Sequence, residues 1–478
     1  MYSGVQSPTY NLQKGAIKSL VQKALLTSDT NVGAGLIPQH LEKLITSTII
    51  QLVPEIAVID PQYDSQKYHE FNRLTALPDG QGAMGESGTT PTTRSTYQRT
   101  GRNLKVTRRK GAVTNFLQDA SKNYIDALSV EMENHVQAHG YDLATQLVWG
   151  NDQADPYTMP GLDYFIATNR KVGTKGGTVP TDFSILDDMI DSNVRRQGAN
   201  HRRAFLMSPE LLSKYSRLLT NVRLNQGLSQ GGLSTVEIPG GWRLQAYRDI
   251  PIVTTTRTRN DNQMGTVTAA KTDSGGAVAA ATYYFHVSYV DVNGESIADA
   301  ERSVTPTGGS SIVTLSWTDV PTAWYYKVYC STSTGAEVLV AILPSKMYDA
   351  AGTPGTRVTT VTFSTTPTTR NPTVSAPADL ATLLSGYVPV TAAMAGDLPI
   401  VVTGGITPER VIFWDLDKIQ GLGKFAYTNS AGSRFGGLVS MEPLAKTDDN
   451  NPFLIKTYGT LIDSWEATSY VAMNIRRA

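Results

Sequence analysis

The side chains that could bind a metal or act as acids, bases and nucleophiles are few in this chain. His135 and His139 are four residues apart, which would place both on one face of a helix as metal ligands. No cysteine accompanies them, so we interpret them as two histidines on a polar face. The single cysteine, Cys330, alternates with Tyr326 and Val328 and is expected in a buried strand, where a thiol packs as a small apolar group.

Motifs for nucleotide binding and hydrolysis are incomplete. Residues Gly421–Lys424 lack the upstream glycine and the following hydroxyl residue of a phosphate-binding loop. Residues Gly85–Gly88 do not have the spacing of a nucleophile elbow. Asp415 and Asp417 flank the end of a predicted strand and are interpreted as a solvated terminus rather than an acidic pair. We therefore assign no catalytic, cofactor-binding or metal-binding residue, and expect that the chain is not an enzyme.

A run of basic residues is the clearest sign of an interaction. With so few large apolar side chains, the segment from Ser87 to Gln118 cannot form a core of its own and needs a partner. It contains no carboxylate and seven cations, on backbone rich in Thr, Ser and Gly: Arg94, Arg99, Arg102, Lys105, Arg108, Arg109 and Lys110.

Two kinds of partner fit this basic segment, and a solvated loop is the remaining alternative. Nucleic acid would be held through its phosphates, but only Tyr97 is placed to stack on bases, and no recognition helix accompanies it. A second copy of the chain would supply acids to pair with the cations. We favour contacts between copies, for which five acids around the following helix are candidates: Asp119, Asp126, Glu131, Glu133 and Asp142.

The overall composition limits the classes of protein. With 478 residues the chain is long enough for two or three domains, and its 42 basic and 42 acidic residues cancel. Neutrality excludes a general attraction to nucleic acid or anionic membranes, so any electrostatic role is local. One cysteine excludes an intrachain disulfide framework. Met1–Tyr10 does not resemble a signal peptide, and no apolar run approaches the roughly 18 residues of a membrane helix.

The pattern of apolar residues predicts the elements around the basic segment. Asn103–Phe116 alternates loosely and is expected to be a strand. The strongest helix pattern follows, from about Tyr124 to Trp149, with apolar residues at helical spacing. After Gly161 strands and helices alternate, with elements predicted at Ala204–Met207, at a helix capped by Ser208, and at two strands joined by Arg248–Asp249.

From about Met264 the pattern is that of an all-β structure. Residues 282–290, 313–317 and 326–330 alternate between apolar and polar, and Asn293–Gly294 is a hairpin-turn signal. Residues 351–377, rich in Thr, Pro and Gly, are predicted to be a linker. Because strand and helix patterns resume after it, we expect a β sandwich inserted within another domain.

The order of these elements resembles the major capsid proteins of tailed bacteriophages, which have the HK97-like fold. Four motifs carry the resemblance: the lead-in Thr30–Pro38, the strand-then-helix step Ala204–Glu210, the hairpin Arg248–Val253, and the closing strands 457–462 and 471–475. The insert separately resembles a fibronectin type III or immunoglobulin-like module, through residues 283–287, 293–296, 315–317 and 326–329.

The resemblance implies an α+β, HK97-like capsid fold with an inserted all-β sandwich. Its implied parts are an N-terminal arm (1–37), a peripheral domain (38–165 and 440–478) with an extended loop (68–118) and a spine helix (121–149), an axial domain (166–263 and 375–439), and the inserted β domain with its linker (264–374). The seven cations would then contact neighbouring subunits.

The same resemblance implies the protein's partners. The chain would assemble with itself into pentamers and hexamers of an icosahedral shell around double-stranded DNA, which it would touch non-specifically. A portal, a separate scaffolding protein and a decoration protein are further implied partners, and no membrane is. The shell would form in the bacterial host cytoplasm and become the virion capsid. A phage tail or baseplate protein, and a carbohydrate-active enzyme with a β accessory module, are the alternatives.

Overall fold

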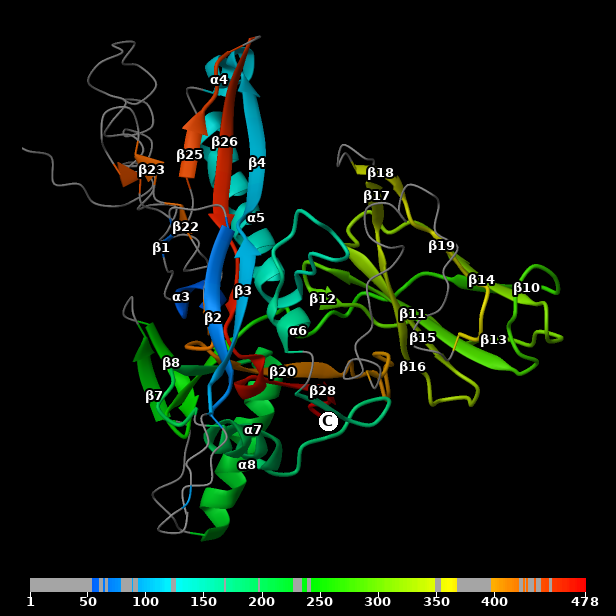
Figure 1. Cartoon of the computed structure of the whole chain (residues 1–478). Coiled ribbons are helices and arrows are strands. Elements are labelled where there is room, and N and C mark those ends of the chain that lie inside the picture. Colours follow the sequence, from blue (N-terminus) through cyan, green and yellow to red (C-terminus); the bar gives the residue numbers. More distant parts are fainter. Residues whose placement is uncertain are drawn as a thin grey trace, which may run out of the picture. The chain divides into compact units, whose positions relative to one another are not determined.

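The computed structural model describes residues 54–59, 63–64, 68–78, 88, 93–121, 126–166, 169–196, 198–226, 234–238, 242–348, 354–367, 397–420, 424–425, 427–428, 434–435, 440–446 and 449–478. The predicted N-terminal arm (1–37), its lead-in motif and Gly421–Gly423 lie outside these ranges. Helices and strands are mixed along the chain (Figure 1). The chain forms two compact units. No described helix is both long enough and apolar enough to cross a membrane.

The smaller unit is built on a three-stranded sheet. Its described residues fall within 106–141 and 426–458. The sheet has the order β25 (Ser440–Pro443), β26 (Asn450–Gly459) and β4 (Lys105–Thr114), and β23 (Tyr427–Thr428) pairs with β24 (Arg434–Phe435). β4 confirms the strand predicted at the end of the basic segment. The ring of Phe453 fills the space beside Gly111, where a Cβ atom would clash.

The long helix α5 (Ala127–Trp149) begins later than predicted. The expected start at residue 121 is wrong, because Ser121 ends a separate helix, α4 (Asn115–Ser121). Asp126 explains the boundary: its Oδ1 accepts the N–H of Ser129 at 3.3 Å and the amide of Gln118 at 2.8 Å. An aspartate that accepts an amide three residues on is a helix N-cap. The predicted apolar stripe is buried, at Leu128, Val136, Leu143 and Leu147.

The larger unit contains a seven-stranded mixed sheet. Its order is β5 (Arg170–Val172), β28 (Tyr470–Ile475), β20 (Glu409–Asp415), β6 (Arg203–Met207), β9 (Ile250–Thr254), β8 (Trp242–Tyr247) and β7 (Ser234–Ile238). Helices α7 (Ser184–Arg195) and α8 (Pro209–Gln226) contribute to one core with it. Ser208 caps α8 as predicted, since its Oγ accepts the N–H of Leu211 at 3.1 Å.

The turn between β8 and β9 confirms the hairpin predicted from sequence. Tyr247 pairs with Ile250, so Arg248 and Asp249 form a two-residue loop. Their φ angles are 50° and 63°, in the left-handed region that matches the twist of a tight hairpin.

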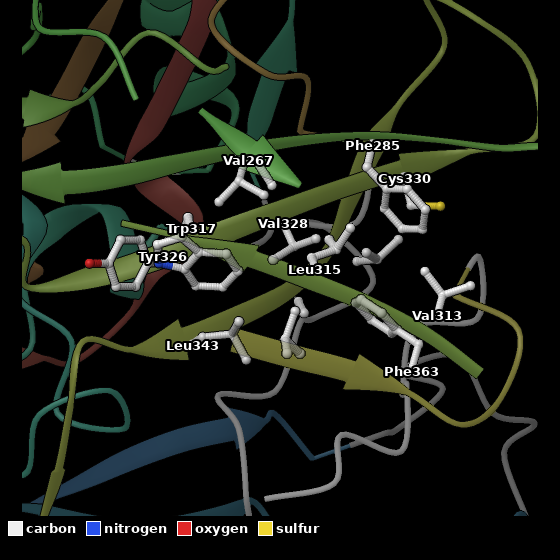
Figure 2. Packing of buried hydrophobic residues seen from close by; sticks show 14 of the residues in the cluster. Val267, Phe285, Val313, Leu315, Trp317, Tyr326, Val328, Cys330, Leu343 and Phe363 are labelled. Atoms are coloured by element: carbon white, nitrogen blue, oxygen red, sulfur yellow. The ribbon is translucent and has the colours of Figure 1, made fainter. Parts of the chain in front are cut away.

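Residues 264–367 form two antiparallel sheets with a shared core. One sheet has the order β10 (Val267–Thr272), β14 (Ile312–Trp317) and β19 (Thr360–Phe363). The other contains β12 (Gly294–Glu295), β11 (Tyr283–Asp291), β15 (Tyr325–Ser331) and β16 (Val338–Pro344), with β13 (Arg302–Val304) paired to β11. Figure 2 shows side chains from both sheets, including Val267, Leu315, Val328 and Phe363, packed together.

The predicted linker 351–377 is partly wrong. β18 (Pro354–Arg357), which pairs with β17 (Lys346–Tyr348), and β19 lie within it. Alternation explains β19, because Val361 and Phe363 are buried in the shared core while Thr360 is exposed.

The remaining elements of the larger unit are short. β2 (Tyr68–Ala76) and β3 (Thr96–Asn103) form an antiparallel hairpin, β1 (Tyr63–Asp64) pairs with β22 (Lys424–Phe425), and β21 (Ile419–Gln420) pairs with β27 (Ile462–Asp463). The short helices described are α3 (Pro54–Ala57), α6 (Leu162–Phe165) and the 3-10 turn Glu466–Thr468.

Candidate functional site

The seven cations of the basic segment lie along two consecutive strands. Arg94 precedes β3, Arg99 and Arg102 are on β3, and the other four are on β4: Lys105, Arg108, Arg109 and Lys110. Residues 96–103 and 105–114 of the segment are therefore strands, and they pair with β2 and β26.

Three of these cations are used within the larger unit. Arg99 forms an exposed ion pair with Glu70 across the β2–β3 hairpin. The Arg102 guanidinium carbon lies 5.0 Å from the centre of the Phe165 ring, within cation–π range. Lys105 Nζ donates a hydrogen bond to the backbone oxygen of Pro156 at 2.7 Å. The Arg99 pair is internal to the hairpin, whereas Arg102 and Lys105 hold the end of β3 and the start of β4 against Phe165 and Pro156.

The other four cations divide by exposure. Arg94, Arg108 and Lys110 are exposed. Arg109 is half-buried in the smaller unit, and its charge acts on His139: burial first, and Arg109 second, lower the pKa of that imidazole to about 4. The exposed three are the members of the segment best placed to reach another molecule.

The other sequence candidates are structural in the described residues. His135 lies 3.0 Å from Glu131, whereas His139 Nε2 lies 2.8 Å from Thr457 Oγ1, so the two histidines do not converge on one point. Cys330 is buried as expected, and burial raises the pKa of its thiol. The interpretation of Asp415 as solvated is wrong, because it is fully buried and lies 2.8 Å from His201 Nδ1.

A buried network of six charged side chains joins distant parts of the larger unit. Its members come from α6, β12, β5, β15, β20 and the segment 397–400. Moving a charge out of water costs several kcal/mol per ion unless an opposite charge compensates. Three carboxylates and three cations take part, so their formal charges cancel: Asp163, Glu295, Asp397, Arg170, Lys327 and Arg410.

Arg410 is the centre of this network. One Nη donates to Asp163 Oδ1 at 2.8 Å and the other donates to Glu295. Glu295 is also held by Lys327, whose Nζ lies 2.8 Å from its Oε2. The Trp149 ring covers the guanidinium, with Cζ of Arg410 4.6 Å from the ring centre. Because Glu295 and Lys327 belong to the β sheets of residues 264–367, the network ties those sheets to β20 and α6.

The pKa values of the acids follow from their surroundings. Burial opposes ionisation of Asp163, but the charges of Arg170, Arg410 and Lys327 outweigh it and hold the pKa below its usual range. At Asp397 burial dominates and raises the pKa, although Arg170 donates to Oδ2 at 2.9 Å. The network can therefore hold segments together, and each of its carboxylates faces a cation rather than an open site.

Sequence reasoning missed these six residues, although two of them left a signal. Lys327 stands among the apolar residues of β15, and Arg410 directly precedes the apolar run of β20. A charge in such a run has to find a partner of opposite sign, which is rarely near in sequence. The partner Glu295 could not be named from sequence, because pairing depends on how the strands meet in space.

Comparison with known proteins decides the class. Residues 44–240 match the family model described as the SU10 major capsid protein. The chain is a major capsid protein of a tailed phage. The matched region holds the β2–β3 hairpin, β4, α5 and the first strands of the larger sheet, and with them all seven cations. A search of curated proteins finds no match to the capsid protein.

Solved structures with similar chains are also capsids or encapsulins. The holo-SrpI encapsulin of Synechococcus elongatus is 8% identical, with a TM-score of 0.40 over 89% of this chain and 88% of that chain. The cyanophage A-1(L) capsid is 11% identical, with a TM-score of 0.42 over 88% and 93%. The capsid of Myoviridae phage XM1 is 7% identical, with a TM-score of 0.38 over 89% and 92%.

Proposed function

We propose that this capsid protein assembles into pentamers and hexamers of a closed icosahedral shell that encloses double-stranded DNA. The match of residues 44–240 to a major capsid protein family carries the proposal. Repeated contacts between identical subunits close into such a shell when each subunit presents complementary surfaces. We also propose that the fold is HK97-like, with the extended loop in 68–118, the peripheral domain in 38–165 and 440–478, and the axial domain in 166–263 and 375–439.

Residues 264–374 are proposed to be an inserted immunoglobulin-like or fibronectin type III-like domain. The two antiparallel sheets with one shared core support this. The buried network adds a property that a loosely tethered module would lack. Glu295 is paired with Arg410, and Lys327 Nζ lies 4.0 Å from Asp163 Oδ2, so the domain is expected to keep one orientation on its subunit.

The further partners are proposals of the same kind. The shell would use a portal, a separate scaffolding protein and a decoration protein, and would touch its DNA non-specifically. Assembly would take place in the host cytoplasm and the product would be the virion capsid.

The exposed cations Arg94, Arg108 and Lys110 are proposed to contact acids of a neighbouring subunit. The three positions are exposed, whereas Arg99, Arg102 and Lys105 have partners in their own subunit. Exposed ion pairs contribute about 0–1 kcal/mol each, but every subunit of a shell would repeat them. Six of the seven cations therefore divide between two roles in this proposal, three making contacts within their own subunit and three holding a neighbour.

The combined variant Arg94→Ala, Arg108→Ala, Lys110→Ala tests this assignment. Shells of the variant are expected to dissociate at a lower denaturant concentration than wild type, while circular dichroism of the subunit stays unchanged. The matched control Arg94→Lys, Arg108→Lys, Lys110→Arg keeps the charges and should dissociate like wild type. Equal stability of the alanine and wild-type shells would show that these cations do not hold neighbouring subunits.

A further inference from the structure

A pocket of about 520 Å³ lies in the larger unit beside the loop at residues 173–177. Lys175, His286, Asp299 and Glu301 are among the residues that line it. The ligand atoms of His286, Glu301 and Glu337 all lie within 4.8 Å of one another. His286 and Glu301 line the pocket, and the buried carboxylate of Glu337 lies directly beside them.

The imidazole presents a lone pair to this cluster. His286 Nδ1 lies 2.8 Å from the backbone oxygen of Asp299, and a carbonyl oxygen only accepts, so Nδ1 carries the hydrogen. Nε2 is left with the lone pair, 3.2 Å from Lys175 Nζ. A histidine whose second nitrogen donates to a backbone carbonyl has the arrangement that metal-ligating histidines use.

The two carboxylates are held together by one backbone amide. Gly335 N donates to Glu301 Oε2 at 3.0 Å and to Glu337 Oε1 at 3.1 Å. Gly335 has a φ of 76°, a conformation that favours glycine, so the turn itself sets this geometry. Adjacent carboxylates repel unless a cation lies between them. Lys175 supplies that charge, with Nζ 2.5 Å from Glu337 Oε2 and 3.8 Å from Glu301 Oε2.

Asp299 is a third carboxylate in the lining of the pocket, and its Oδ1 accepts the N–H of Val287 at 2.8 Å. Its side chain is 2% exposed, and its Oδ2 accepts no hydrogen bond. The guanidinium of Arg302 is near this oxygen, at 3.7 Å from Nε. Three acids thus face the two cations Lys175 and Arg302, and a buried oxygen without a hydrogen bond is costly.

We propose that His286, Glu301 and Glu337 form a binding site for one divalent cation of the zinc class, which the Lys175 ammonium group closes. One imidazole nitrogen and two carboxylate oxygens are a donor set that zinc accepts, with water in the fourth position. The pocket has room for that water. A zinc ion would replace the ammonium and leave Lys175 free to turn outward from its loop, which contains Gly176 and Gly177 at positive φ.

Zinc titration of the full chain tests the site. Lys175→Met removes the charge and keeps most of the stem, so this variant should bind one zinc ion per chain at least about tenfold more tightly than wild type. Adding His286→Gln to it should weaken binding by about tenfold or more. Glu301→Gln, at a partly exposed position, is a second test if the histidine variant folds poorly.

Titration calorimetry with zinc chloride gives the affinity and the stoichiometry, and circular dichroism checks folding. If Lys175→Met and Lys175→Met/Glu301→Gln bind zinc alike, or if neither binds one ion per chain, the proposed site does not exist.

Discussion

Replacing Arg410 by Met should destabilise the larger unit strongly. Arg410 is buried and contacts both Asp163 and Glu295, and the Met side chain fills similar space without charge. In the variant Asp163 keeps Arg170 at 3.1 Å, and Glu295 keeps Lys327 at 2.8 Å. The network would then carry one uncompensated negative charge among buried side chains.

The expected cost is about 3–5 kcal/mol, the range for breaking a buried ion pair by removing one partner. This cost arises because a buried charge is left uncompensated, and it is larger than the net stabilisation that the ion pair contributes. The double variant Arg410→Met/Glu295→Gln removes one charge of each sign and restores neutrality. Its cost should therefore fall below the sum of the two single costs by about 1–3 kcal/mol.

Urea unfolding of the unassembled subunit, followed by tryptophan fluorescence and circular dichroism, measures these differences. Arg195→Met is a matched control, because Arg195 is exposed on α7, and it should change stability by about 0.5 kcal/mol or less. If Arg410→Met lies within about 1 kcal/mol of wild type, or if the double variant costs the full sum, the reasoning about the network is refuted.

Two further substitutions test other parts of the structure. Burial raises the pKa of Glu409 from 4.5 to about 7, so between these values the folded chain holds a proton that the unfolded chain has released, and the free energy of unfolding falls as pH rises. In urea unfolding, the free energy of unfolding of Glu409→Gln should therefore equal that of wild type near pH 5 and exceed it by up to about 3 kcal/mol at pH 8. A difference between the two proteins that does not change with pH would contradict this. Phe363→Ala should cost about 3–5 kcal/mol and speed hydrogen exchange in β14 and β19, because Phe363 is fully buried in the shared core of Figure 2. The neighbouring Thr362→Ala, on the outward side of β19, is its control, and equal exchange in both would place β19 outside that core.

Features that depend on neighbouring residues could be predicted from the sequence. The β8–β9 hairpin, the cap at Ser208 and the strands β11, β14 and β15 follow from turn chemistry and alternation, and the structure confirms them. The start of α5 was misplaced because apolar spacing alone does not show where a cap will form. Asp126 sets the start of the helix, because its side chain accepts hydrogen bonds from Ser129 N–H and from the Gln118 amide.

Features that depend on long-range pairing could not be predicted. Asp415 was interpreted as solvated because it follows a strand, yet His201, 214 positions earlier, covers it. The charge network pairs Arg410 with Glu295, 115 positions away. For the basic segment, the sequence shows only the number of cations and the absence of acidic residues between them. The structure is needed to tell which cations make contacts within the subunit and which are exposed.

Electron cryomicroscopy of particles assembled from the full chain tests the central claim most directly. The account predicts closed icosahedral shells in which the exposed cations Arg94, Arg108 and Lys110 lie against a neighbouring subunit. The account would be contradicted if the protein formed only monomers or open tubes under all conditions. Closed shells in which these cations face only solvent would also contradict it.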